Sequence, residues 1–104
     1  MLVPRIAALI DAHCPPERAA AVRRLLSDEC SLTLPLVTPE SIQLIERIQA
    51  GVLRTTRWDP EFITPRIRLA QVDWRDLLVA AGFATSVTTH VTWLEGAMQS
   101  GVLD

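Results

Sequence analysis

The segment DWRDLLVAAGF, residues 73 to 83, decides the fold. Asp73 can cap a helix, and Asp76 stands three residues later, as in a capping box. Gly82 favours the left-handed conformation in which helices end, and Phe83 can fold back on the last turn. Four apolar residues recur at helical spacing and predict one buried face: Trp74, Leu77, Leu78 and Ala81. The segment therefore predicts a helix that packs against other apolar helices.

Two more helices are predicted near the start of the chain. One covers Pro4 to about His13, and the next begins at Pro16, which suits the first turn, and runs to about Asp28. The short link at residues 14–16 makes the two a helical hairpin. Apolar spacing marks their buried faces: Leu2, Ile6, Leu9, Ile10 and His13 in the first helix, and Ala19, Val22, Leu25 and Leu26 in the second.

The middle of the chain predicts an extended connector followed by a helix. Residues 31–37 alternate Leu with smaller residues, as in a short strand, but Pro35 lacks a donor for the ladder. Thr38 can cap a helix with Pro39 in its first turn. Gly51 lies near the end of this helix, and residues 54–58 are predicted to form a loop. Four residues make the buried face of the helix: Ile42, Ile45, Ile48 and Val52.

Two possible helix starts follow in tandem, at Asp59-Pro60-Glu61 and at Thr64-Pro65. A proline inside a helix costs about 3 kcal/mol. We therefore expect a main helix to begin at Thr64, after a short turn.

The last segment fits either a helix or a strand. A helix capped by Thr85 or Ser86 is preferred, because a strand would find only the proline-broken residues 31–37 as a partner. The helical stripe would consist of Val87, Val91, Leu94 and Met98, whereas the alternating set is Val87, Thr89, Val91 and Trp93.

These elements predict an all-α protein, a single compact domain of five or six short helices spanning residues 1–104. A chain of 104 residues has enough apolar surface for one core, and its 49% apolar content argues against disorder. No apolar run approaches the roughly 20 residues that span a membrane. The start of the chain has no secretory signal, so we expect a cytoplasmic protein without membrane association.

The charge pattern argues against nucleic-acid binding. The net charge is −2, with +2 over residues 54–75 and −3 over residues 76–104. Phosphate binding requires a concentrated basic excess. All ten basic residues are Arg; GC-biased codon usage, typical of some bacteria, explains this better than selection for bidentate anion contacts.

Four residues are of the types that bind zinc: His13, Cys14, Cys30 and His90. A helix between the two cysteines would separate them by on the order of 20 Å, which excludes a shared ion or a disulfide. We therefore expect two free thiols, no metal and no cofactor. Asp11, His13 and Cys14 resemble a nucleophile cluster, and a helix start could activate Cys14. Adjacent residues at a helix end point apart, however, so no catalytic residue and no enzyme activity are predicted.

His90 and two arginines are further candidates for a polar site. His90 lies among apolar residues and is expected to be hydrogen-bonded at the edge of the core. Arg54 and Arg57 could contact an anion near the helix starts at Asp59 and Thr64. The opposing interpretation assigns Arg54 to the end of the preceding helix and Arg57 to a surface ion pair. A small enzyme or anion-binding subunit is the third functional hypothesis.

Residues 77–94 resemble a helix-turn-helix motif: Leu77 to Phe83, a short polar turn, then Ser86 to Leu94. The resemblance implies a DNA-binding regulator whose second helix reads the bases. Thr88 stands where such families usually have an apolar residue, and the second helix has no Arg or Lys. This regulator is the second functional hypothesis.

The preferred hypothesis is association with a protein partner or with itself, as an adaptor, regulatory or inhibitor-like subunit. Trp93 is predicted to lie between the buried stripe and the polar side of the last helix. The small residues Gly96 and Ala97 beside it would let another helix approach. The possible interface is thus Trp93, Ala97 and Met98, whereas Trp74 is assigned to the core.

Overall fold

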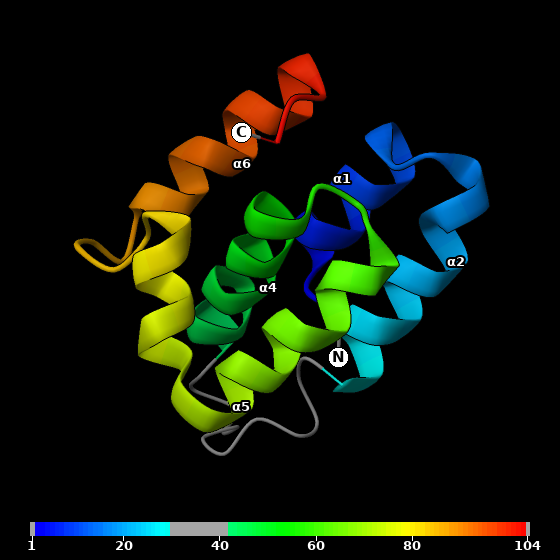
Figure 1. Ribbon diagram of the computed structural model, residues 1–104. Coiled ribbons are helices and arrows are strands. Elements are labelled where there is room, and N and C mark those ends of the chain that lie inside the picture. The colour runs from blue at the N-terminus through cyan, green and yellow to red at the C-terminus, as the bar shows by residue number, and fades with distance from the viewer. Residues whose placement is uncertain (1, 30–41, 104) are drawn as a thin grey trace.

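The computed structural model describes residues 2–29 and 42–103. Within these ranges there are five α-helices, one π-helical turn and no strand. They are α1 (Pro4–His13), α2 (Pro16–Arg24), η1 (Leu25–Glu29), α4 (Ile42–Thr56), α5 (Pro60–Ala81) and α6 (Thr89–Ser100) (Figure 1). The all-α prediction is confirmed. The predicted connector at residues 31–37 and the helix start at Thr38 lie outside the described residues.

Helix α4 lies at the centre of the molecule, with the other helices around it (Figure 1). All its residues from 48 to 53 are buried, as expected of a helix enclosed by others. Gln49 is fully buried: its Oε1 accepts from the Val3 amide at 3.2 Å, and its Nε2 donates to the Leu26 carbonyl at 3.2 Å. These hydrogen bonds join the hairpin of α1 and α2 to the central helix.

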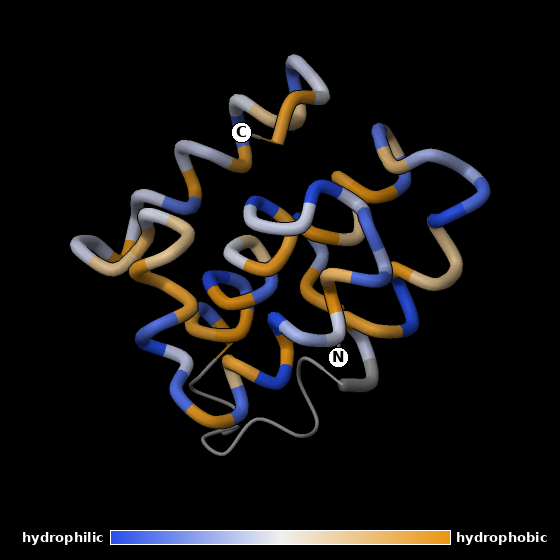
Figure 2. The backbone as a smooth tube through the Cα atoms, viewed as in Figure 1, coloured by the Kyte–Doolittle hydropathy of each residue, from blue (hydrophilic) through white to orange (hydrophobic). Residues whose placement is uncertain are grey.

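The first two helices begin at Pro4 and Pro16, as predicted. The predicted buried stripes are largely confirmed: Ile6, Leu9, Ile10, Val22, Leu25 and Leu26 are buried, and Leu2, His13 and Ala19 are half-buried. The second helix does not keep its α-helical form to Asp28, because its last turn widens into η1. Orange and blue patches alternate along these helices in Figure 2, as expected of helices with one face toward a core.

The predicted start of the main helix at Thr64 is wrong. Helix α5 begins at Pro60, where the Asp59 carboxylate accepts from the Glu61 amide at 3.0 Å. Pro65 lies inside the helix and removes the amide that would bond to the Glu61 carbonyl. Ile63 is fully buried. Burial of Ile63 in this first turn offsets the missing hydrogen bond.

The decisive segment is helical, as predicted, although it continues α5 and its Trp74 is only half-buried. Asp73 has a non-helical backbone (φ −151°, ψ 94°), and its carboxylate accepts from the Arg75 amide at 3.0 Å. Helix α5 is therefore kinked where a new helix was expected to begin. Gly82 ends it at φ 79°, and the Phe83 amide donates to the Leu78 carbonyl at 2.8 Å. Phe83 folds back and is fully buried, as predicted.

The loop predicted at residues 54–58 is mostly helix. Helix α4 continues to Thr56, which is buried, and only a tight turn separates it from α5. Arg57 and Trp58 have left-handed backbones, with φ of 51° and 68°. Such backbone conformations are unfavourable for residues other than glycine. Trp58 is only 7% exposed, so burial of its ring stabilises the turn.

The last segment is a helix, as preferred, but its predicted start is wrong, and of its predicted buried stripe only Leu94 is buried and Val91 half-buried. Helix α6 begins at Thr89, and Ser86 instead accepts from the Thr88 amide at 3.2 Å in the preceding turn. Val87 and Met98 are 55% and 40% exposed. The buried residues are His90, Leu94 and Ala97. The face is rotated because His90, which looks polar in sequence, is in the core.

Two glycines in helices provide a matched test of packing. A Cβ atom on Gly51 would lie 3.3 Å from the Ala81 Cβ, where α4 meets α5, whereas one on Gly96 would meet nothing within 4 Å. Gly51→Val should lower the free energy of unfolding by about 2 kcal/mol through overpacking. Gly96→Ala should raise it by about 0.5–1 kcal/mol through helix propensity. Chemical denaturation measures both, and equal effects would contradict the close approach of α4 and α5.

Candidate functional site

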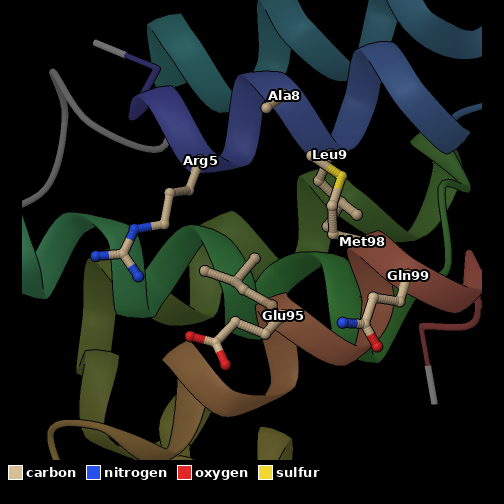
Figure 3. Close-up of a pocket in the computed structure, with 7 residues that line it drawn as sticks. Arg5, Ala8, Leu9, Glu95, Met98 and Gln99 are labelled. Atoms are coloured by element: carbon tan, nitrogen blue, oxygen red, sulfur yellow. The ribbon is translucent and has the colours of Figure 1, made fainter.

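A groove of about 320 Å³ lies between α1 and α6 (Figure 3). Its lining is mainly aliphatic, with a few polar side chains at the rim: Arg5, Ala8, Leu9, Leu94, Glu95, Met98 and Gln99. Leu9 and Leu94 are almost fully buried and form the floor. Ala8 and Met98 are exposed, so the groove presents apolar surface to solvent.

Two sets of contacts hold α1 and α6 side by side and in the same direction. At the start of both helices, Glu46 of α4 contacts Arg5 at 3.6 Å and His90 at 3.0 Å. At their ends, His13 donates from Nε2 to the Met98 carbonyl at 2.6 Å. The His13 ring also lies against Gly101, where an added Cβ would be 2.9 Å from Nδ1. The groove therefore runs along two parallel helices fixed at both ends.

The two charged residues of this lining stand on opposite walls. Arg5 belongs to α1 and Glu95 to α6, and both reach toward the same end of the groove (Figure 3). The Arg5 side chain is 57% exposed despite its contact with Glu46. Among the described residues, no cation lies within ion-pair distance of Glu95. The groove thus combines an apolar floor with one positive and one negative wall.

Glu46 and His90 form a buried polar pair beneath the start of α6. His90 is fully buried, its Nε2 donates to Glu46 Oε1, and its Nδ1 has no partner among the described residues. The Phe83 ring packs edge-on to the imidazole, with centroids 6.3 Å apart. The prediction of a hydrogen-bonded histidine is confirmed, although His90 lies inside the core and not at its edge. The pair joins α4 to α6.

A second groove, of about 360 Å³, lies beside the last turns of α5. It is lined by Arg47, Trp74, Arg75, Leu78, Val79 and Ala84. Arg47 donates from Nε to the Phe83 carbonyl at 2.9 Å, which holds the end of α5. The Arg75 guanidinium lies 5.4 Å from the centroid of the Trp74 ring. Trp74, assigned to the core, is thus half-buried at the edge of this groove.

Of the predicted interface residues, the structure places only Met98 on the first groove. Ala97 is 2% exposed and packs into the core. Trp93 is half-buried: its ring lies 5.6 Å from that of Phe83, and its Nε1 donates to the Leu103 carbonyl at 2.9 Å. Trp93 therefore anchors the end of the chain against the core.

The predicted anion contacts, Arg54 and Arg57, line neither groove. The Arg54 guanidinium lies 5.2 Å from the centroid of the Phe83 ring and close to Gly82, at the end of α5. Arg57 is exposed in the turn that follows α4. Arg54 therefore has a packing role in this structure.

The cysteines were considered as a nucleophile and as metal ligands. Cys14 is a buried free thiol, and this burial raises its pKa; Arg18 lowers it and Glu17 raises it further. A raised pKa leaves less thiolate near neutral pH, the opposite of an activated nucleophile. Cys30 lies outside the described residues. Among residues 2–29 and 42–103, no group of three or more His, Cys, Asp or Glu is placed to hold a metal ion.

The segment that resembles a helix-turn-helix has a long turn. Seven residues, 82–88, separate α5 from α6, where the motif usually has three or four. Its second helix buries His90 and Leu94, and among Asp, Glu, Lys and Arg it contains Glu95 alone.

Comparison of the chain with protein-family models, with curated proteins and with solved structures found no match. Within the described ranges, no helix is both long enough and apolar enough to cross a lipid bilayer.

Most residues of the α1–α6 groove were missed from the sequence, which pointed only to Met98. Arg5, Ala8 and Leu9 are 85 or more residues away from Glu95, Met98 and Gln99 along the chain. Two sequence patterns pointed weakly to the groove. Ala8 is a small residue on the outer side of α1, and Glu95 and Gln99 are four residues apart and so lie on the same side of α6. Neither pattern shows that the two helices meet.

Proposed function

We propose that this chain is a small protein-association module that binds its partner in the α1–α6 groove. The exposed apolar groove carries the proposal: Met98 is 40% exposed beside Ala8, above a floor of Leu9 and Leu94. Grooves between helices commonly receive the apolar face of another helix. A role as an adaptor, regulatory or inhibitor-like subunit fits this mode of binding.

Binding is favoured over catalysis because of what lines the groove. Its floor is aliphatic, and among the described residues its lining has one carboxylate, Glu95, with no histidine or second carboxylate to act with it as an acid–base pair. His90, the most plausible base, is fully buried and bonded to Glu46. We extend the proposal to a cytoplasmic location, supported by the free thiol of Cys14. Bacterial origin, supported by the exclusive use of Arg, is also part of the proposal.

The experiment fills the groove and compares the proteins that are retained. Ala8→Trp places an indole over Leu9, whereas Ala20→Trp adds the same side chain to an exposed position of α2. Tagged wild type and both variants are purified from the native host and analysed by mass spectrometry. We expect partners to be retained by wild type and Ala20→Trp and reduced about ten-fold or more with Ala8→Trp, as for loss of an interface hot spot.

Self-association measured on the same three proteins is part of this test. The proposed function is wrong if Ala8→Trp, folded as judged by its melting curve, retains every partner and every oligomer that Ala20→Trp retains.

A further inference from the structure

We infer that the groove receives a second copy of this chain, placed by a two-fold axis that runs along the groove between α1 and α6. This inference rests on the proposed function, because it names the partner of the same groove. In the dimer, α1 of each copy lies opposite α6 of the other.

The parallel course of the two helices makes this arrangement self-complementary. Glu46 joins Arg5 and His90 at the start of both helices, and His13 joins Met98 at their ends. A two-fold rotation about an axis along the groove places α1 of one copy opposite α6 of the other. It leaves the position of each residue along the groove unchanged. A two-fold interface requires that each contact occurs twice, with the roles of the copies exchanged.

The charges on the walls satisfy that requirement. The long Arg5 side chain of one copy reaches along the groove toward Glu95 of the partner subunit, and the reciprocal pair forms at the same end. Glu95 has no cation among the described residues, and Arg5 keeps a 57% exposed side chain with N–H donors to spare. The groove lining contains no other charged residue, so no like charges face each other across the axis. Charge complementarity thus supports a second copy as the occupant of the groove.

The apolar residues fit the same axis. Met98 of each copy extends over the groove of the other, where Ala8 leaves space beside Leu9. Methionine is unbranched and flexible and fills irregular gaps well. Seven residues line the groove, whereas a stable interface involves about 20–30 residues on each side. We therefore expect a weak, reversible dimer.

Reversing one charge at a time tests the reciprocal pairing. Arg5→Glu alone places two acids opposite each other at both pairs, and Glu95→Arg alone places two arginines there. Each variant should dimerise about ten-fold or more weakly than wild type, measured by sedimentation velocity over a concentration series. An equimolar mixture of the two should recover association, because both pairs in the heterodimer are then of opposite charge. The double variant Arg5→Glu/Glu95→Arg should recover it as well.

The controls separate folding from association. Arg5→Glu also brings an acid near Glu46, so its melting temperature is compared with that of Glu95→Arg, which has no such contact. Arg68→Glu, exposed on α5 and outside the groove, should leave dimerisation unchanged. The inference is overturned if wild type stays monomeric throughout, or if the mixture associates no more than each variant alone. If the chain is monomeric while Ala8→Trp still loses another protein, the proposed function stands and the second copy is excluded.

Discussion

Phe83→Ala should lower the free energy of unfolding by about 3–5 kcal/mol. Phe83 is fully buried, and its ring lies 5.6 Å from that of Trp93, 6.3 Å from that of His90 and 5.2 Å from the Arg54 guanidinium. The truncation therefore leaves a cavity where α4, α5 and α6 meet. Urea denaturation followed by circular dichroism measures the change.

Phe62→Ala is the matched control, because Phe62 lies on α5 but is 59% exposed. Its truncation should cost less than about 1 kcal/mol, since little buried area is lost. A loss for Phe83→Ala as small as that for Phe62→Ala would contradict the packing of α6 on Phe83.

Glu46→Leu should cost about 3 kcal/mol, because it leaves a buried polar partner unpaired. His90 has one hydrogen bond, from Nε2 to Glu46, and its other nitrogen has no partner among the described residues. Without Glu46 both ring nitrogens are buried and unpaired, and Arg5 loses its contact. Glu46→Gln keeps an acceptor for Nε2 and should cost only about 1 kcal/mol.

The double variant Glu46→Leu/His90→Leu identifies the cause of that loss. Replacing both partners with apolar residues removes the unpaired groups, so the double variant should be more stable than Glu46→Leu alone. Thermal and urea denaturation of the single and double variants measure this coupling. If the losses of the two single variants simply add in the double variant, side-chain packing, and not the hydrogen bond between Glu46 and His90, determines what the pair contributes to the free energy of unfolding.

Signals that act within one or two turns were predictable from the sequence. Pro4 and Pro16 begin helices, Asp73 caps a turn, and Gly82 ends α5, because each effect depends on the backbone nearby. The start of α5 was predicted wrongly because the local cost of Pro65 is outweighed by burial of Ile63 and Ile67 against the rest of the fold.

The errors in α6 and in the site have a common origin in distant contacts. His90 belongs to the core because it bonds to Glu46, 44 residues away, and this pairing rotates α6 relative to its apolar stripe. That rotation leaves Met98 exposed and turns Ala97 inward. The groove forms only when α6 packs on α1, so periodicity within either helix could not identify its charged walls.

The pairing of α1 with α6 also sets an order of events during synthesis. His13 and Met98, which bond across the two helices, are 85 residues apart. At typical rates of about 5–20 residues per second, Met98 is added roughly 4–17 s after His13. During part of that interval the hairpin of α1 and α2 has emerged from the ribosome while α6 is still to be synthesised. The side of α1 that carries Ala8 and Leu9 then lacks the cover that α6 gives it in the folded protein.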